Sequence, residues 1–303
     1  MVVRNWWNRN GRKWIRICDK CMSCLVWLFL LGIVWLLFQV FCFTSFRIPT
    51  SSMEPTLLPG DNILVNKWIM GARLFDVWDA AEGKEVEIYR LPGLGKIKRN
   101  DVVVFNFPHH YRWDSISMDL MTYYVKRCIG LPGDTVRIKD ARYLVAEVTD
   151  TLGYLPAQRK LGKLIASGKA EQQGVATGSF PEDSLVNWNI GNFGPLFIPA
   201  SGSRVVMDEV NVLLYRRAIE WEQKKKLCVQ GGTILLGDSL ITEYVFRKNY
   251  YFVGGDNVMY SQDSRYWGLL PEEYIVGKAT RIWKSVDLQE DTAKWDRVWK
   301  KIE

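Results

Sequence analysis

The longest apolar stretch of the chain runs from Leu25 to Phe43 and contains one Gln and no charged residue. As an α-helix it is about 28 Å long, close to the roughly 30 Å hydrocarbon core of a bilayer. A buried core helix would keep a polar face, and a cleaved signal peptide would have a shorter apolar region ending in small residues. The segment after Phe43 is bulky. The pattern therefore predicts a retained transmembrane anchor at 25–43.

Short segments rich in β-branched and aromatic residues follow the anchor, separated by turn residues such as those of 131–134. They predict strands at 62–68, 101–107, 122–130, 135–140, 250–257 and 275–286. The fold class expected is mainly β, behind one N-terminal transmembrane helix, with an inserted α/β subdomain where the pattern changes.

The pattern changes between residues 141 and 244. A long polar loop is expected at 167–183, and one helix at 207–226 with Val210, Leu213, Leu214 and Trp221 on one face. The last segment has apolar residues at helical spacing and predicts an amphipathic helix, which either packs on the domain or lies on a membrane surface. The resulting division is a basic tail at 1–24, the anchor at 25–43, a β core at 44–140 and 245–286, the insert at 141–244 and the C-terminal helix at 287–303.

The net charge of +7 is unevenly distributed. Six basic residues against Asp19 give the tail before the anchor a net charge of +5, which leaves +2 for the rest. A nucleic-acid-binding protein would need a basic face on its folded part, so that class is excluded. Basic flanks of membrane spans stay in the cytoplasm. We therefore expect the tail in the cytoplasm, and everything after Phe43 outside the cytoplasmic (inner) membrane.

The six cysteines leave their roles open. The segment "CDKCMSC" at 18–24 has the spacing of a zinc ligand pair, but a second pair is missing, so palmitoylation or apolar filling beside the membrane fits better. Cys128 and Cys228 would both be exported, and the sequence does not decide whether they form a disulfide.

A candidate nucleophile lies directly after the anchor, in "RIPTSSMEPTLLPGD". Ser51 and Ser52 stand between two prolines, which stiffen the backbone there. A serine nucleophile needs a base, usually histidine, and the only histidines are His109 and His110. A turn serine that caps the following residues is the alternative.

A lysine could supply the base. Lys126 lies in the predicted strand "TYYVKRCIG", on the same face as Tyr124 and Cys128. Burial disfavours the ammonium ion and lowers the pKa from about 10.4, and a neutral amine can act as a general base. The alternative is a lysine that extends to solvent from a sheet edge.

A third polar stretch is "GGDNVMYSQDSRYWG" at 254–268. Asp263 and Arg265 are close enough to pair, and a loop held in this way could place Ser261 near a catalytic amine. The alternative is a well-ordered surface loop.

These three stretches, in this order after an N-terminal anchor, resemble bacterial type I signal peptidases (leader peptidases). The resemblance covers the anchor and residues 47–68, 99–138 and 250–279, and the insert sequence "NWNIGNFGPLFIPASG" resembles the version in Bacteroidetes enzymes. It implies a β-rich fold with a Ser-Lys dyad, no metal or cofactor, and exported preproteins bound as an added strand with small residues one and three positions before the cut. Membrane lipid is the other expected partner.

The resemblance also assigns roles. Ser52 is implied as the nucleophile and Lys126 as the general base, while the Thr50 hydroxyl and the Ser52 N–H bind the oxyanion. Ser261 is implied to hydrogen-bond and orient the lysine. The implied supporting polar residues around the site are Arg127, Asp256, Asp263 and Arg265.

The third stretch departs from the family at one point. Val258, Met259 and Tyr260 stand where the family usually has Arg-Asp-Asn. This departure leaves open a specialised or non-catalytic paralogue that acts as a membrane-anchored binding protein. A self-cleaving Ser-Lys repressor would need a DNA-binding domain, and this chain has an anchor instead.

Overall fold

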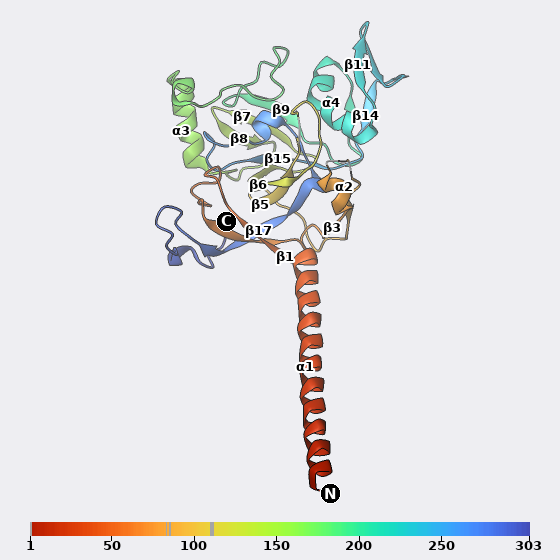
Figure 1. The fold of residues 1–303 in the computed structure, drawn as a ribbon. Helices are drawn as coiled ribbons and strands as arrows, with labels where there is room; N and C mark the ends of the chain where they lie inside the picture. The colour runs from red at the N-terminus through yellow and green to blue at the C-terminus, as the bar shows by residue number, and fades with distance from the viewer. Residues whose placement is uncertain (1, 83, 85, 110–111) are drawn as a thin grey trace.

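The computed structural model describes residues 2–82, 84, 86–109 and 112–303, and among these the side chains from Cys18 onward except that of Ala81. Helix α1, Val2–Phe41, projects from the rest of the chain as a long stalk (Figure 1). Its part from Cys18 to Phe41 is, among the described residues, the one helix long and apolar enough to cross a membrane, and none of it is buried. The helix ends two residues before the predicted limit, because the chain enters a strand at Phe43.

A seven-stranded antiparallel sheet forms the centre of the domain, in the order β1-β2-β17-β5-β6-β15-β16. Its strands are β1 Phe43–Arg47, β2 Asp61–Asn66, β5 Val102–Phe107, β6 Asp119–Gly130, β15 Tyr250–Gly254, β16 Leu270–Pro271 and β17 Ile275–Ser285. Every residue of β5 is buried, as a run of β-branched and aromatic residues without alternation predicts. All the predicted strands of this sheet are confirmed.

Smaller sheets surround the central one. They are β8-β7-β9, β10-β14, β11-β12-β13 and β3-β4. Their strands are β3 Arg73–Leu74, β4 Tyr89–Arg90, β7 Thr135–Lys139, β8 Arg142–Val145, β9 Phe193–Phe197, β10 Arg204–Val206, β11 Leu227–Gln230, β12 Thr233–Leu236, β13 Ser239–Leu240 and β14 Glu243–Val245. The remaining helices are α2 Val77–Ala81, α3 Leu155–Ala166, η1 Glu171–Gln173, α4 Glu209–Gln223, α5 Ser264–Trp267, η2 Glu272–Tyr274 and η3 Trp295–Arg297.

The predicted helix of the insert is confirmed as α4. The Asp208 carboxylate caps its N-terminus by accepting from the Asn211 N–H at 2.7 Å, and Lys224 ends it with a left-handed backbone (φ 54°). The predicted face is partly right: Leu214 is buried, and Val210 and Trp221 pack half-buried against the core. The other buried residues of α4 are Val212, Tyr215, Ala218 and Ile219. Helix α3 was not predicted; it buries only Gln158 and Leu161 completely.

The amphipathic helix predicted at 287–303 is wrong. Only the short η3 is helical there, and the rest of the segment returns to β17. The Ile282 N–H donates to Lys300 O at 2.9 Å and the Ile302 N–H donates to Thr280 O at 3.0 Å, so the backbone bonds the sheet instead of itself. Arg297 adds a buried ion pair with Asp61 at 2.6 Å. These tertiary contacts outweigh the helical spacing of the apolar residues.

Two hydrophobic clusters stabilise the domain. The larger joins the central sheet to the insert and includes Phe105, Leu196 and Tyr215. The smaller lies between β2, β5 and β17 and includes Met53 and Leu57, which follow the candidate serines in the chain. The two cysteines whose pairing was left open are free: Cys128 is buried in the larger cluster, whereas Cys228 is exposed on β11.

Candidate active site

Ser52 lies on the turn that follows β1, directly before the buried Met53. Met53 and Leu57 are 1% and 0% exposed, and the Leu57 N–H donates to Met53 O at 2.9 Å. Because these two side chains are fixed in the smaller cluster, Ser52 must face away from it. The buried side chains of Met53 and Leu57 therefore fix the position of Ser52 on this turn.

Lys126 reaches Ser52 from β6. Its Nζ donates to Ser52 Oγ at 2.6 Å and to Val125 O at 3.1 Å, and the side chain is almost completely buried. Burial lowers the pKa of Lys126 from 10.5 to about 8; Asp263 and Asp256 oppose that change and Arg265 adds to it. About a tenth of this amine is then neutral at pH 7, far more than for an ordinary lysine, and the neutral form is the one that can accept the serine proton.

Thr50 stands on the other side of the serine. Its Oγ1 lies 3.5 Å from Ser52 Oγ, and its side chain is exposed to the cleft. The cleft has a volume of about 410 Å³ and includes both hydroxyls and the lysine. Its other walls include Ile48, Pro49, Tyr124, Val125, Tyr260 and Gln262. A mostly apolar groove thus ends at three groups that can donate or accept protons.

The loop after β15 is held by a buried ion pair. Arg265 Nε donates to Asp263 Oδ1 at 2.8 Å, and both side chains are almost completely buried. Burial alone would raise the pKa of Asp263, but the charge and hydrogen bonds of Arg265 keep that pKa below its ordinary value. The same pair holds the loop backbone: the Gly255 N–H donates to Asp263 Oδ2 at 2.8 Å, and Arg265 Nη2 donates to Val258 O at 2.8 Å.

Ser261 does not make the expected contact. Its Oγ is buried without a hydrogen-bond partner among the described residues, while the bonds of Lys126 Nζ go to Ser52 and Val125. Ser261 nevertheless lies beside the dyad, because a Cβ on Gly255 would be 2.1 Å from Ser261 Oγ and 2.6 Å from Ser52 O. Sequence reasoning missed Gly255, and the Gly-Gly pair before Asp256 was the available signal.

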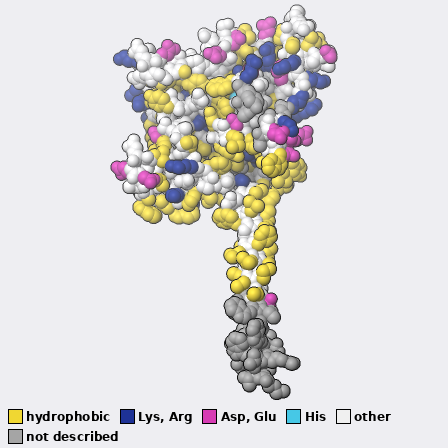
Figure 2. Space-filling view, in the orientation of Figure 1, with side chains coloured by type: hydrophobic (Ala, Val, Ile, Leu, Met, Phe, Trp, Pro, Cys, Tyr) yellow, Lys and Arg dark blue, Asp and Glu magenta, His cyan; other side chains and the backbone are white. Residues whose placement is uncertain are grey.

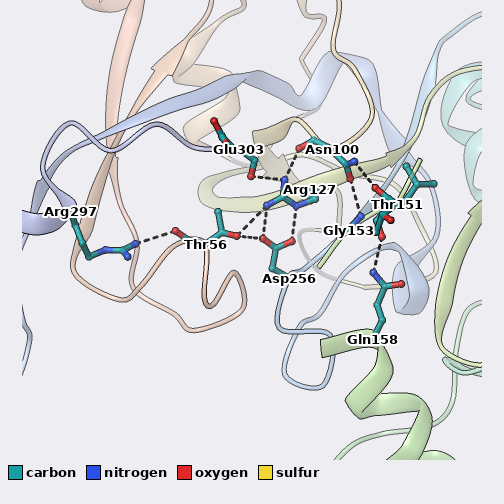
Figure 3. Close-up of polar contacts among 10 residues, drawn as sticks. Thr56, Asn100, Arg127, Thr151, Gly153, Gln158, Asp256, Arg297 and Glu303 are labelled. Atoms are coloured by element: carbon teal, nitrogen blue, oxygen red, sulfur yellow. Dashed lines mark hydrogen bonds and ion pairs between the residues drawn. The ribbon is translucent and has the colours of Figure 1, made fainter. Parts of the chain in front are cut away.

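Arg127 and Asp256 form a second buried ion pair beneath the site. Arg127 binds Asp256 with two hydrogen bonds, Nε to Oδ1 at 2.7 Å and Nη2 to Oδ2 at 2.6 Å. Thr56 donates to the same carboxylate at 2.5 Å, and Arg127 Nη1 donates to the backbone oxygens of Asn100 and Glu303. Figure 3 shows Arg127 at the centre of these contacts. They link the serine segment, β6 and the loop after β15.

His109 is not part of the cleft. It is buried, its Nδ1 contacts Ser115 O at 2.7 Å, and its ring packs near Phe107 and Trp267. Burial lowers the pKa of His109 to about 4, so it stays neutral at physiological pH. His110 lies outside the described residues. Lys126 is thus the base candidate that contacts Ser52.

Residues 21–284 match the protein family described as "Signal peptidase, peptidase S26". The chain belongs to the signal peptidase family, peptidase S26. Among its relatives are proteins named signal peptidase I from Buchnera aphidicola (subsp. Schizaphis graminum), 29% identical over 83% of this chain and 71% of the relative, and from Aquifex aeolicus, 28% identical over 86% of this chain and 83% of the relative. A third signal peptidase I, from Pseudomonas fluorescens, is 28% identical over 82% of this chain and 68% of the relative.

The match confirms the expected fold class, a mainly β signal peptidase domain behind one apolar N-terminal helix, and the enzyme class, a serine endopeptidase of signal peptidase I type. A crystallised signal peptidase I from Enterococcus faecalis superposes with a TM-score of 0.26 at 20% identity, over 61% of this chain and 98% of its own. The likeness of the insert to Bacteroidetes enzymes stays a prediction.

Proposed function

We propose that this signal peptidase removes N-terminal signal peptides from exported preproteins, with Ser52 as nucleophile and Lys126 as general base. The observation that carries the proposal is the 2.6 Å contact between Lys126 Nζ and Ser52 Oγ. A buried lysine next to a serine on a cleft has the geometry that nucleophilic acyl transfer requires. The comparisons give no support to a non-catalytic binding protein, and the dyad contact is intact in spite of Val258, Met259 and Tyr260.

The reaction proceeds in two halves. Neutral Lys126 takes the proton of Ser52 Oγ as the oxygen attacks the scissile carbonyl. The Ser52 N–H and the Thr50 hydroxyl stabilise the oxyanion, a role worth about 3–4 kcal/mol per donor in other acyl-transfer enzymes. Lys126 then gives its proton to the leaving amine. A water, deprotonated in turn by Lys126, hydrolyses the acyl-enzyme and restores the Ser52 hydroxyl.

The substrate binds as an added strand at β6. The partner β15 pairs with β6 only at Arg127, Cys128 and Gly130. From Thr122 to Lys126, no strand of the described residues pairs with the edge of β6 that faces away from β5. An extended peptide there would gain main-chain hydrogen bonds and end beside Ser52. The mostly apolar cleft would hold the small side chains that the family resemblance implies one and three positions before the cut.

The domain lies against the bilayer with the face around the base of α1. Figure 2 shows apolar side chains gathered there, and Figure 1 places β17 and the last residues of the chain at the same level. The exposed large apolar residues of these segments and of the β2 end are Trp68, Trp283, Leu288, Trp295 and Trp299. Tryptophan is typical of membrane–water interfaces, so lipid is the proposed partner of this face.

The topology follows from the tail. Its net charge of +5 keeps residues 1–24 in the cytoplasm and puts the catalytic domain on the outer, periplasmic side of the inner membrane. The core in two parts (44–140 and 245–286) and the insert (141–244) are retained as the proposed division of the domain.

Cleavage of a preprotein tests the proposal. The full chain, solubilised in detergent, is incubated with a preprotein and the N-terminus of the product is sequenced. Ser52→Ala and Lys126→Ala abolish cleavage with the fold intact, and the neighbouring Ser51→Ala is the matched control with a mild effect. Equal loss in Ser51→Ala, or cleavage by Lys126→Ala, would overturn the dyad assignment.

A further inference from the structure

The C-terminal end of α1 is capped by a lysine of the catalytic domain. Lys67, which directly follows β2, donates from Nζ to Gln39 O at 2.8 Å and to Val40 O at 3.2 Å. Its backbone N–H donates to Cys42 O at 2.9 Å. The last carbonyls of a helix lack partners within the helix and carry partial negative charge, so an ammonium group both satisfies and stabilises them.

Aromatic rings extend the same junction along the helix. The ring of Trp68 lies 6.0 Å from that of Phe43, Phe43 lies 5.7 Å from Phe38, and Phe38 lies 6.2 Å from Trp35. Such separations are those of interacting aromatic pairs. The polar cap and the row of rings together fix the direction in which the helix leaves the domain.

No flexible linker separates the anchor from the nucleophile. After the helix ends at Phe41, the chain enters β1, and every residue of β1 pairs with β2, from Phe43 opposite Asn66 to Arg47 opposite Asn62. β2 is itself paired with β17 inside the sheet. The position of Ser52 relative to the end of the membrane helix is therefore set by the Lys67 junction and the rigid sheet.

We propose that Lys67 is a positioning residue: by capping α1 it holds Ser52 at a fixed height above the bilayer and so selects which peptide bond of a membrane-embedded signal sequence is cut. The inference rests on the proposed function. A substrate whose apolar segment lies in the membrane presents its bonds at heights fixed by that segment, whereas a short soluble peptide presents its bond at any height. Lys67 thus affects the choice of cleavage site in a membrane-embedded substrate and not in a soluble peptide.

The test uses the full chain reconstituted in phospholipid vesicles. One substrate is a preprotein with two identical small-residue cleavage sites, one nearer to and one farther from its apolar segment, and the other is a soluble peptide containing the same site. Lys67→Met removes the donors and keeps the aliphatic chain, and Lys67→Arg restores a charged donor. Lys169→Met, at an exposed lysine after α3, is the matched control.

Wild type cuts the two sites unequally. In Lys67→Met the ratio of the two products moves toward one by about fivefold. This factor corresponds to about 1 kcal/mol, the stabilisation expected of a charge at a helix end. Lys67→Arg and Lys169→Met keep the wild-type ratio, and kcat/KM for the soluble peptide stays within about twofold in all three variants. An unchanged product ratio in Lys67→Met overturns the inference. A fall of about fivefold in kcat/KM for the soluble peptide also overturns it, because Lys67 would then act on the catalytic domain itself. Cleavage by Ser52→Ala would instead refute the proposed function.

Discussion

Replacing Lys126 with methionine should stabilise the protein while abolishing its activity. The pKa of Lys126 is lowered from 10.5 to about 8, chiefly by burial. That difference corresponds to about 3 kcal/mol of folding free energy that the native state gives up to bury the amine. Methionine has a similar length and no charge, although it loses the hydrogen bonds to Ser52 and Val125. We expect a net gain of about 2 kcal/mol at pH 7.

The pH dependence of the free energy of unfolding shows whether the charge of Lys126 causes the difference in stability. Below about pH 8 the lysine is protonated in both the folded and the unfolded state, so its full cost is present. Between about pH 8 and 10.5 only the unfolded state holds the proton, so wild-type stability rises with pH and the cost disappears above 10.5. The advantage of Lys126→Met over wild type should therefore shrink by about 2 kcal/mol between pH 7 and pH 9.5.

Urea unfolding in detergent, followed by tryptophan fluorescence, measures both quantities. Lys169→Met makes the same chemical change at an exposed lysine and should show neither the gain nor its pH dependence. A gain for Lys126→Met that is equal at the two pH values would show that the methionine stabilises by packing alone. No gain at pH 7 would refute the conclusion that the buried lysine is costly.

Three further predictions concern the site. The rate of preprotein cleavage (kcat/KM) should rise with pH around a midpoint of about 8, and Lys126→Arg should be inactive because arginine stays charged; a flat profile would count against a lysine base. Gly255→Ala should lower kcat by at least tenfold and also lower the melting temperature, since its Cβ would lie 2.1 Å from Ser261 Oγ and 2.6 Å from the backbone oxygen of Ser52. Gly178→Ala, where the nearest atom is 3.7 Å away, should cleave normally and melt as wild type does. Arg127→Met leaves the Asp256 carboxylate buried and unpaired, so a thermal melt should show a loss of about 3–5 kcal/mol; an unchanged melting temperature would contradict this.

Local patterns predicted the parts of this fold that depend on local sequence. The run of β-branched and aromatic residues in β5 predicts a buried strand, and the similar run around Lys126 predicts β6, which is buried from Lys126 to Gly130. The C-terminal segment was not predictable in this way, because Arg297 pairs with Asp61 and the backbone bonds β17, and both partners are distant in sequence. Apolar spacing cannot report such contacts.

In the candidate site, too, the motifs predicted some features, and others depend on tertiary packing. The motifs identified Ser52 and Lys126, whose side chains meet at 2.6 Å although they come from segments far apart in the sequence. The contact expected of Ser261 is absent, and the role of Gly255 was not foreseen, because both depend on how closely the loop after β15 packs on the serine segment. A distance of a few tenths of an ångström is not encoded in a motif.

The proposed binding of the substrate along β6, where no strand of the described residues pairs with that edge from Thr122 to Lys126, has a consequence for the evolution of secreted proteins. Main-chain hydrogen bonds are the same for every residue, so an enzyme that recognises its substrate along a sheet edge reads an extended conformation and little of the sequence. Only the positions whose side chains enter the cleft are constrained to be small. Signal sequences can then diverge freely at their other positions without any compensating change in the peptidase, and a newly exported protein needs only a short extended segment with small residues at the right places.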